Sequence, residues 1–448
     1  YRWLERAWRA GLRVVVQHVT GNSVLCEFGL GLGTQTMRYG CGDMVTVDRS
    51  LQAVRDLEAY IDAQWGGPGQ GWLRVVESPA QAREVIAQGK LAVVLGIEIS
   101  NLFDCLLTPP DGEARCTPEG VEATLDRYQA LGVRVLFPVH KFDNAFSPGD
   151  GDGGIIELGN VINAGHYNDK VEDCPLGNDG GFDDGPLSFG QLNRPRDEYL
   201  APPVLDFADF VDDPVAAVRP FFGAVLGGGQ AGNFCQRATM TPLGESLLQG
   251  MMARGMIPDV AHLPQRSVLR ALEMLQANDY PVLSTHGRTH DGQTYGLGGM
   301  TGAGIGGCGD SARPGRMVAG LNARSAEREA AGAHPGVALG FDLNGFAGGR
   351  RPRFGDDSRC GPDQANPVAY PFMSYDEAVT FLPPTLGERA VDFNTEGFLH
   401  IGMLPELIED ARQDGATDED LVPLFRSAEA FVQMWEKAEA RAAALSGE

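Results

Sequence analysis

The stretch LAVVLGIE, residues 91–98, decides the fold class of this chain, because an unbroken apolar run leads directly to one glutamate. A short apolar run of this kind predicts a strand that is buried on both faces, as in a parallel sheet. Four more runs have the same form, each followed by one ionisable residue: Val133–Val139 by His140, Met256–Ala261 by His262, Pro281–Thr285 by His286, and Val337–Phe341 by Asp342. Parallel strands end at one edge of a sheet. We therefore expect these residues and Glu98 to share the edge on which (β/α)8 barrels carry their active sites.

Helix signals separate the predicted strands. A capping hydroxyl stands before a proline at Ser78-Pro79, Thr117-Pro118 and Thr241-Pro242, and each helical pattern closes at a glycine. Pro264 begins a fourth pattern, while Leu12–Val19 predicts a further strand and Leu51–Trp65 a further helix. This alternation predicts an α/β fold, a (β/α)8 TIM-type barrel, with residues 1–448 forming one domain.

Two segments depart from the alternation. Residues from about 147 to 203 are rich in Gly, Asp and Asn and predict an insertion that forms a lid, a binding loop or a disordered segment. Asp150, Asp152 and Glu157 hint at a calcium loop, but their spacing misses the EF-hand pattern, which favours a solvated acidic loop. Residues from about 405 to 445 predict terminal helices packed on the barrel.

Charge and cysteine content narrow the function classes. The formal net charge of −24 argues against a nucleic-acid partner, since phosphate binding needs basic surface. No apolar run is long enough for a transmembrane segment. Cys105 and Cys116, two of eight cysteines, bracket a short loop in a way that suits a disulfide. The even count favours an extracellular or periplasmic location; buried thiols in a cytoplasmic protein are the alternative.

The five strand-end residues suit a metal centre. Imidazole and carboxylate ligands are those that zinc and similar divalent ions prefer, and we expect one or two such ions. Glu98 is placed to bridge two ions, and His262 and His286 to ligate one of them. Asp342 is expected to act as general base and then acid, and His140 to hydrogen-bond an oxyanion. Lys141 follows His140, so period two predicts that it points away from the site. His18 is expected to be structural.

The chain resembles the membrane dipeptidase (renal dipeptidase, peptidase M19) branch of the amidohydrolase superfamily. The resemblance is carried, in order, by these segments: KLAVVLGIE (90–98), LGVRVLFPVHKFDNAF (131–146), MTPLGESLLQGMMARGMIPDVAHLP (240–264), YPVLSTH (280–286), GVALGFDLNGF (336–346) and the closing helical stretch 397–436. It implies a (β/α)8 barrel with a binuclear zinc site. It also implies Glu98 as bridging ligand, His262 and His286 as ligands, His140 as a substrate contact and Asp342 as the acid/base.

The chain departs from the family pattern in two places. The family's first strand carries an HxD zinc-binding pair, and no HxD occurs in this sequence, so the pair either lies before Tyr1 or is absent. The family also places an arginine after the second zinc histidine to grip a peptide carboxylate. The spacing here differs, and Arg288 is the candidate substitute.

These observations together predict a metal-dependent hydrolase that cleaves an amide or peptide bond of a small-molecule or short-peptide substrate. A lactonase or esterase using the same metal site is one alternative. A catalytically inactive barrel that serves as a binding or surface protein is the other. The sequence does not fix the oligomeric state, and a homodimer is one alternative.

Overall fold

The computed structural model describes residues 1–34, 36, 39–107, 116–150, 155–164, 170–171, 185–187, 230–287, 289–305, 315–343, 349, 351–356, 358 and 366–447. Contacts group the chain into two compact units. Unit 1 comprises Tyr1–Val16, Val54–Val94 and Leu283–Lys437, and unit 2 comprises Gln17–Ala53, Leu95–Val282 and Ala438–Glu448.

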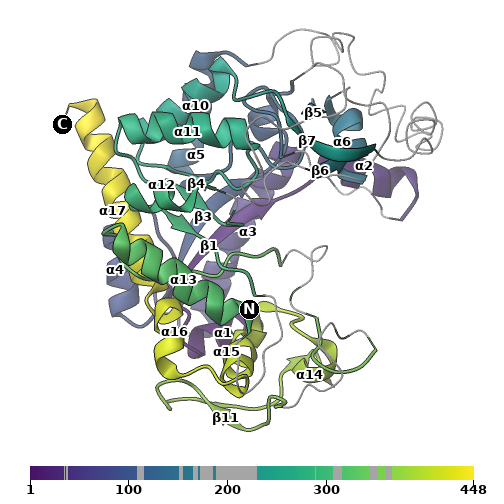
Figure 1. The fold of residues 1–448 in the computed structure, drawn as a ribbon. Coiled ribbons are helices and arrows are strands. Elements are labelled where there is room, and N and C mark those ends of the chain that lie inside the picture. Colours follow the sequence, from purple (N-terminus) through teal and green to yellow (C-terminus); the bar gives the residue numbers. More distant parts are fainter. Residues whose placement is uncertain are drawn as a thin grey trace. The chain divides into compact units, whose positions relative to one another are not determined.

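The main sheet has the strand order β1-β3-β4-β8, with β2 also paired to β3, and the pairs β2–β3, β3–β4 and β4–β8 are parallel (Figure 1). Its strands are β1 (Val14–Thr20), β2 (Leu73–Val75), β3 (Leu91–Glu98), β4 (Val133–Leu136) and β8 (Ile257–Pro258). Every residue of β3 is buried, as the continuous apolar run predicts. The predicted α/β class is therefore confirmed, with parallel strands joined through helices.

The other predicted strands are shorter than their apolar runs. β4 ends at Leu136, before Pro138, and β8 ends at Pro258, because proline offers no N–H to a neighbouring strand. In unit 1, β9 (Leu283–Ser284) pairs in parallel with β10 (Met300–Thr301). The predicted strand over Val337–Phe341 is not a strand in the structure; within it, Leu339 forms a single parallel bridge to Ala303.

The helices predicted from their caps all form. In α4 (Pro79–Ala87), α5 (Pro118–Ala130) and α10 (Pro242–Ala253), the preceding Ser or Thr side chain accepts a backbone N–H of the first turn. α11 (Gln265–Ala277) follows Pro264, and α3 (Asp43–Gln64) begins earlier than its predicted start at Leu51. In unit 2, α5 packs on α10 and on β4, so that these helices cover the strands that carry the site.

The remaining elements of unit 2 include part of the predicted insertion. A helix, α6, lies within it, and three short strands form an antiparallel sheet in the order β5-β7-β6. The elements are α2 (Ser23–Gly31), η1 (Leu102–Asp104), α6 (Ile155–Ala164), β5 (Lys170–Val171), β6 (Gly185–Leu187) and β7 (Gln230–Gln236). The rest of the insertion lies outside the described residues.

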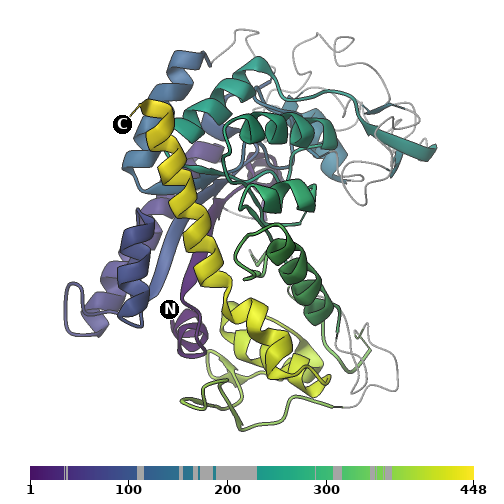
Figure 2. The same cartoon turned by 60° about the vertical axis from the view of Figure 1, so that its left-hand side comes forward.

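Unit 1 has its own apolar core, formed by residues of α13, α15 and α16 together with the β11–β12 hairpin. Beside it, the buried Arg353 guanidinium pairs with the buried carboxylates of Asp410 and Asp414. The elements are α1 (Arg2–Arg9), α12 (Asp291–Gly296), α13 (Arg316–Ala330), β11 (Phe372–Met373), β12 (Thr380–Phe381), β13 (Thr385–Leu386), β14 (Arg389–Ala390), α14 (Phe393–Glu396), η4 (Ile401–Met403), α15 (Leu404–Gln413) and α16 (Asp418–Phe425). After α15 and α16 the chain continues into α17 (Ser427–Ser446), which is one long helix (Figure 2).

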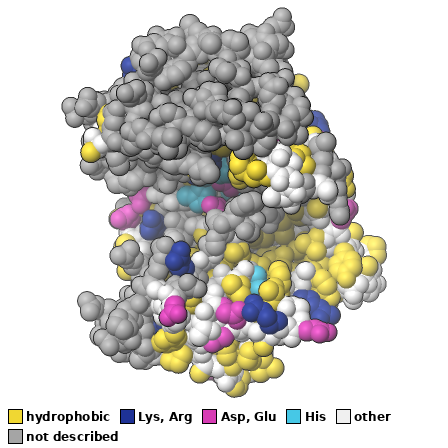
Figure 3. Space-filling view, turned by 90° about the vertical axis from the view of Figure 1, so that its right-hand side faces the viewer, with side chains coloured by type: hydrophobic (Ala, Val, Ile, Leu, Met, Phe, Trp, Pro, Cys, Tyr) yellow, Lys and Arg dark blue, Asp and Glu magenta, His cyan; other side chains and the backbone are white. Residues whose placement is uncertain are grey.

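Large apolar side chains are exposed around β11–β14 in unit 1, where the space-filling view shows a hydrophobic area at the bottom (Figure 3). They include Met373, Tyr375, Leu382 and Leu386. Among the described helices, none is long and apolar enough to cross a membrane.

Two disulfides join described cysteines, both in unit 2. The Cys105–Cys116 bond is the predicted one, and Cys26–Cys41 is a second. Both are compatible with an extracellular or periplasmic location.

Candidate metal centre

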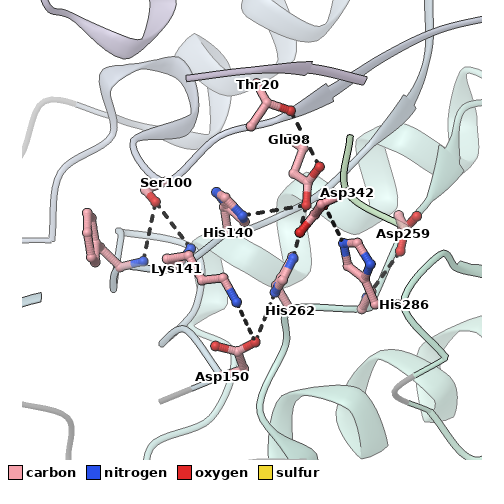
Figure 4. Close-up of polar contacts among 12 residues, drawn as sticks. Thr20, Glu98, Ser100, His140, Lys141, Asp150, Asp259, His262, His286 and Asp342 are labelled. Atoms are coloured by element: carbon pink, nitrogen blue, oxygen red, sulfur yellow. Dashed lines mark hydrogen bonds and ion pairs between the residues drawn. The ribbon is translucent and has the colours of Figure 1, made fainter. Parts of the chain in front are cut away.

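Glu98 is the centre of a buried polar cluster in unit 2. It is the last residue of β3 and only 5% exposed, so its carboxylate lies at the carboxyl end of the most buried strand. Its Oε1 atom lies 2.9 Å from His262 Nε2 and 3.5 Å from His140 Nε2 (Figure 4). The Thr20 hydroxyl at the end of β1 makes a long contact of 3.5 Å with Oε2. One carboxylate oxygen therefore faces two imidazole nitrogens.

His262 is held between two carboxylates. It follows β8 in the turn that leads to α11, and its Nδ1 lies 2.9 Å from Asp150 Oδ2 while its Nε2 faces Glu98. Burial disfavours the charged ring, but the hydrogen bonds to Asp150 and Glu98 outweigh burial and raise the pKa of His262 to about 9. Without an ion, both ring nitrogens are therefore protonated and donate to carboxylates.

His140 is kept neutral in the same cluster. Its ring lies edge-on to that of His262, with 4.6 Å between the ring centroids. Burial, and after it the nearby His262, lowers the pKa of His140 to about 3 even though Glu98 acts in the opposite direction. At neutral pH the His140 ring therefore has one nitrogen that carries a proton and one with a lone pair that can accept a hydrogen bond.

Asp150 and Lys141 join the cluster, which the sequence did not predict. Asp150 is 1% exposed rather than part of a solvated acidic loop, and its Oδ2 contacts His262. The Lys141 ammonium lies 3.6 Å from the same oxygen, so the expectation that Lys141 points away from the site was wrong. Period two fails at this position because β4 has already ended at Leu136. The signals in the sequence were the unusual composition of the segment from about residue 147 and the acidic group Asp150, Asp152 and Glu157, which was interpreted as a solvated loop.

His286 and Asp342 lie together in unit 1. His286 Nε2 is 3.6 Å from Asp342 Oδ1, and the two side chains are 19% and 39% exposed. Their backbones are brought close by glycines: a Cβ built on Gly340 would lie 1.7 Å from the Thr285 carbonyl oxygen, and one on Gly302 would lie 1.9 Å from it. Only glycine allows this approach, which carries Asp342 to the end of the His286 strand.

The remaining predicted residues fall in different places. Arg288 lies outside the described residues. His18 packs its ring edge-on against Phe137. A Cβ on Gly96 would lie 2.2 Å from the His18 ring, so the glycine leaves room for the imidazole. This packing is consistent with the structural role expected for His18.

Comparison with known proteins gives matches in structure alone. No protein-family model matches the chain, and no curated protein matches it in sequence. Solved structures similar to it include an amidohydrolase from Pseudomonas aeruginosa (11% identity, TM-score 0.45), with 98% of this chain and 92% of that chain covered. A metallo peptidase of the M19 family, dipeptidase AC, has 11% identity and a TM-score of 0.45, with 97% and 88% covered.

A metallo peptidase from Rhodobacter sphaeroides, liganded with a phosphinate mimic of the dipeptide L-Ala-D-Ala, has 12% identity and a TM-score of 0.41, with 88% and 74% covered. These structures carry the same family names as the sequence resemblance. Their TM-scores lie between 0.41 and 0.45 and their identities between 11% and 12%.

Proposed function

We propose that this chain is a metal-dependent hydrolase that cleaves an amide or peptide bond of a small substrate. The observation that carries the proposal is the buried Glu98 oxygen that faces His262 Nε2 at 2.9 Å and His140 Nε2 at 3.5 Å. A glutamate at the end of a fully buried strand, surrounded by imidazoles, is costly to maintain for stability alone. Such a cluster is therefore better explained by an ion that it binds.

The donor atoms fit a divalent ion. Glu98, His262 and His286 offer one carboxylate oxygen and two imidazole nitrogens, a set that could hold a metal ion. These donor types suit zinc better than calcium or magnesium, which prefer oxygen ligands. A bound ion of this kind would supply a Lewis acid and lower the pKa of a water molecule toward neutrality. We assign the three residues to this role, with Glu98 as the bridging ligand if two ions are present.

Two further side chains are assigned to proton transfer and to the substrate. Asp342 is 39% exposed, so its carboxylate is accessible to take a proton from the attacking water and return it to the leaving group. His140 is neutral and can donate one N–H to the oxygen of a carbonyl under attack without losing its own proton. Arg288 is proposed to bind a substrate carboxylate.

The proposed architecture is a single (β/α)8 barrel domain. It is supported by the parallel pairs β2–β3, β3–β4, β4–β8 and β9–β10 and by the helices that separate them. An extracellular or periplasmic location is proposed on the two disulfides.

Metal analysis of the purified full chain, combined with activity on a panel of substrates, tests the proposal. We expect one or two zinc ions per chain and zinc-dependent hydrolysis of dipeptides, measured as amine release. If lactones or esters were hydrolysed in place of dipeptides, the proposed substrate class would be wrong and the proposed metal-dependent hydrolysis would stand. A chain that takes up no divalent ion and hydrolyses none of these substrates would be the inactive binding barrel, and the proposal would be wrong.

A further inference from the structure

Asp150 is a buried carboxylate that the proposed mechanism does not use. It lies in the predicted insertion, yet it is 1% exposed and its Oδ2 is 2.9 Å from Nδ1 of His262. A carboxylate can only accept a hydrogen bond, so Nδ1 carries a proton that it donates to Asp150. Nε2 donates to Glu98 while no ion is bound, and it is the nitrogen that can ligate an ion once its proton has left.

The position of Asp150 is fixed by the chain around it. Its neighbour Gly149 donates its backbone N–H to Asp143 Oδ1 at 2.8 Å, and the backbone N–H of Asp143 donates to Asn160 at 2.7 Å. A Cβ on Gly149 would lie 2.8 Å from the Lys141 carbonyl oxygen, so the two backbone segments are in close contact. Asp150 is thus held by a packed loop.

Lys141 provides the charge that balances Asp150. Its ammonium lies 3.6 Å from Asp150 Oδ2, and the two side chains are 18% and 1% exposed. The backbone N–H groups of Lys141 and Phe142 donate to the hydroxyl of Ser100, two residues after Glu98. The contacts therefore form a continuous path from the end of β3 through Lys141 and Asp150 to His262 (Figure 4).

We propose that Asp150 is a positioning residue for the metal centre: it holds His262 in the tautomer and orientation in which Nε2 can ligate an ion, and Lys141 pairs with the Asp150 carboxylate from the other side. Carboxylates that accept the second N–H of a metal-binding histidine orient the ring and raise its basicity. This inference rests on the proposed function, because it assigns a role at the same site.

The test measures zinc affinity by competition with a chelator of known affinity, on the full chain first stripped of metal. Asp150→Ala removes the acceptor, and we expect a loss of about 10–100-fold in zinc affinity. Asp150→Asn keeps a neutral acceptor and should recover part of that loss, whereas Lys141→Met should weaken binding less than Asp150→Ala. Asp43→Asn is the matched control, because Asp43 is also 1% exposed and in unit 2, where it accepts the backbone N–H groups of Ser23 and Asn101. It should bind zinc as the unsubstituted chain does.

A second measurement uses the unsubstituted protein and does not depend on any variant folding. Nitrogen-15 NMR of the zinc-loaded chain should show His262 with a protonated Nδ1 and a metal-bound Nε2. Metal bound at Nδ1, or equal zinc affinity of the Asp150→Ala variant and the parent chain, would overturn the positioning role and leave the proposed function standing. A parent chain that binds no divalent ion would overturn both.

Discussion

Glu98 is the side chain on which the proposed site depends most, because its Oε1 atom faces both His140 and His262. Glu98→Gln keeps the shape of the side chain but removes its charge and one acceptor oxygen. We therefore expect zinc affinity to fall by about tenfold or more, measured as metal retained after dialysis against a chelator. Glu157→Gln, which changes another buried glutamate of unit 2, is the control and should retain the ion. Full occupancy in Glu98→Gln would rule out a ligand role.

Asp342 is predicted to act on protons and not to hold the ion. Asp342→Asn should keep the metal content of the parent chain while lowering kcat by about 10²–10⁴-fold, the usual contribution of a general acid or base. The two quantities are measured on one preparation, by elemental analysis and by the rate of amine release. Loss of the ion in this variant would instead make Asp342 a ligand.

At the residue scale, the sequence predicted the members of the buried polar cluster that directly follow an apolar run, and it missed the members that do not. Glu98 is the last residue of β3, while His140 and His262 lie four residues beyond the ends of β4 and β8, and unit 2 brings all three together. Asp150 comes to His262 from 112 positions away along the chain, in a segment without periodicity. Such a contact is set by tertiary packing, which local pattern does not encode.

At the scale of elements, helix starts were predicted better than strand ends. A Ser or Thr cap followed by proline acts within one turn, so α4, α5 and α10 begin where the sequence places them. Strand ends depend on partners far away in the chain. β4 ends before Pro138. The run 337–341 forms a single parallel bridge, between Leu339 and Ala303, and no strand.

The segment that carries Asp342 depends on Gly340, which gives an element-scale prediction. Gly340→Ala should destabilise unit 1 by about 2 kcal/mol or more, because the new Cβ would lie 1.7 Å from a backbone oxygen that cannot move aside easily. Thermal unfolding followed by circular dichroism measures the change. Gly292→Ala in α12 is the control, since its Cβ would meet no atom within 4 Å and alanine favours helix. Equal losses in the two variants would contradict the packing argument.

At the scale of the whole molecule, composition and alternation predicted the α/β class and the parallel sheet, while the antiparallel sheet β5-β7-β6 was not foreseen. Its strands lie in and after a segment rich in Gly and Asp, where neither strand nor helix periodicity is present. The Cys105–Cys116 bond was predictable because its loop is short, whereas Cys26–Cys41 had no such signal in its spacing.

Stability of the folded chain should also depend on pH through Asp43. Burial raises the pKa of this carboxyl from 3.8 to about 6, against the hydrogen bonds that it accepts from the backbone of Asn101 and Ser23; nearby Asp104 adds to the rise. The folded state therefore binds this proton more tightly than the unfolded state does. The resulting stability is fully present below the unfolded pKa and is lost as the pH rises through about 6.

The Asp43→Asn variant isolates this contribution, because asparagine does not titrate and all other groups are shared. The free energy of unfolding of the parent chain, relative to the variant, should rise by up to about 3 kcal/mol between pH 7 and pH 4. Denaturant unfolding of both proteins across this range measures it, with the metal removed from both. Parallel stability curves would mean that Asp43 titrates at the same pH in the folded and unfolded chain, and that its burial costs the charged form nothing.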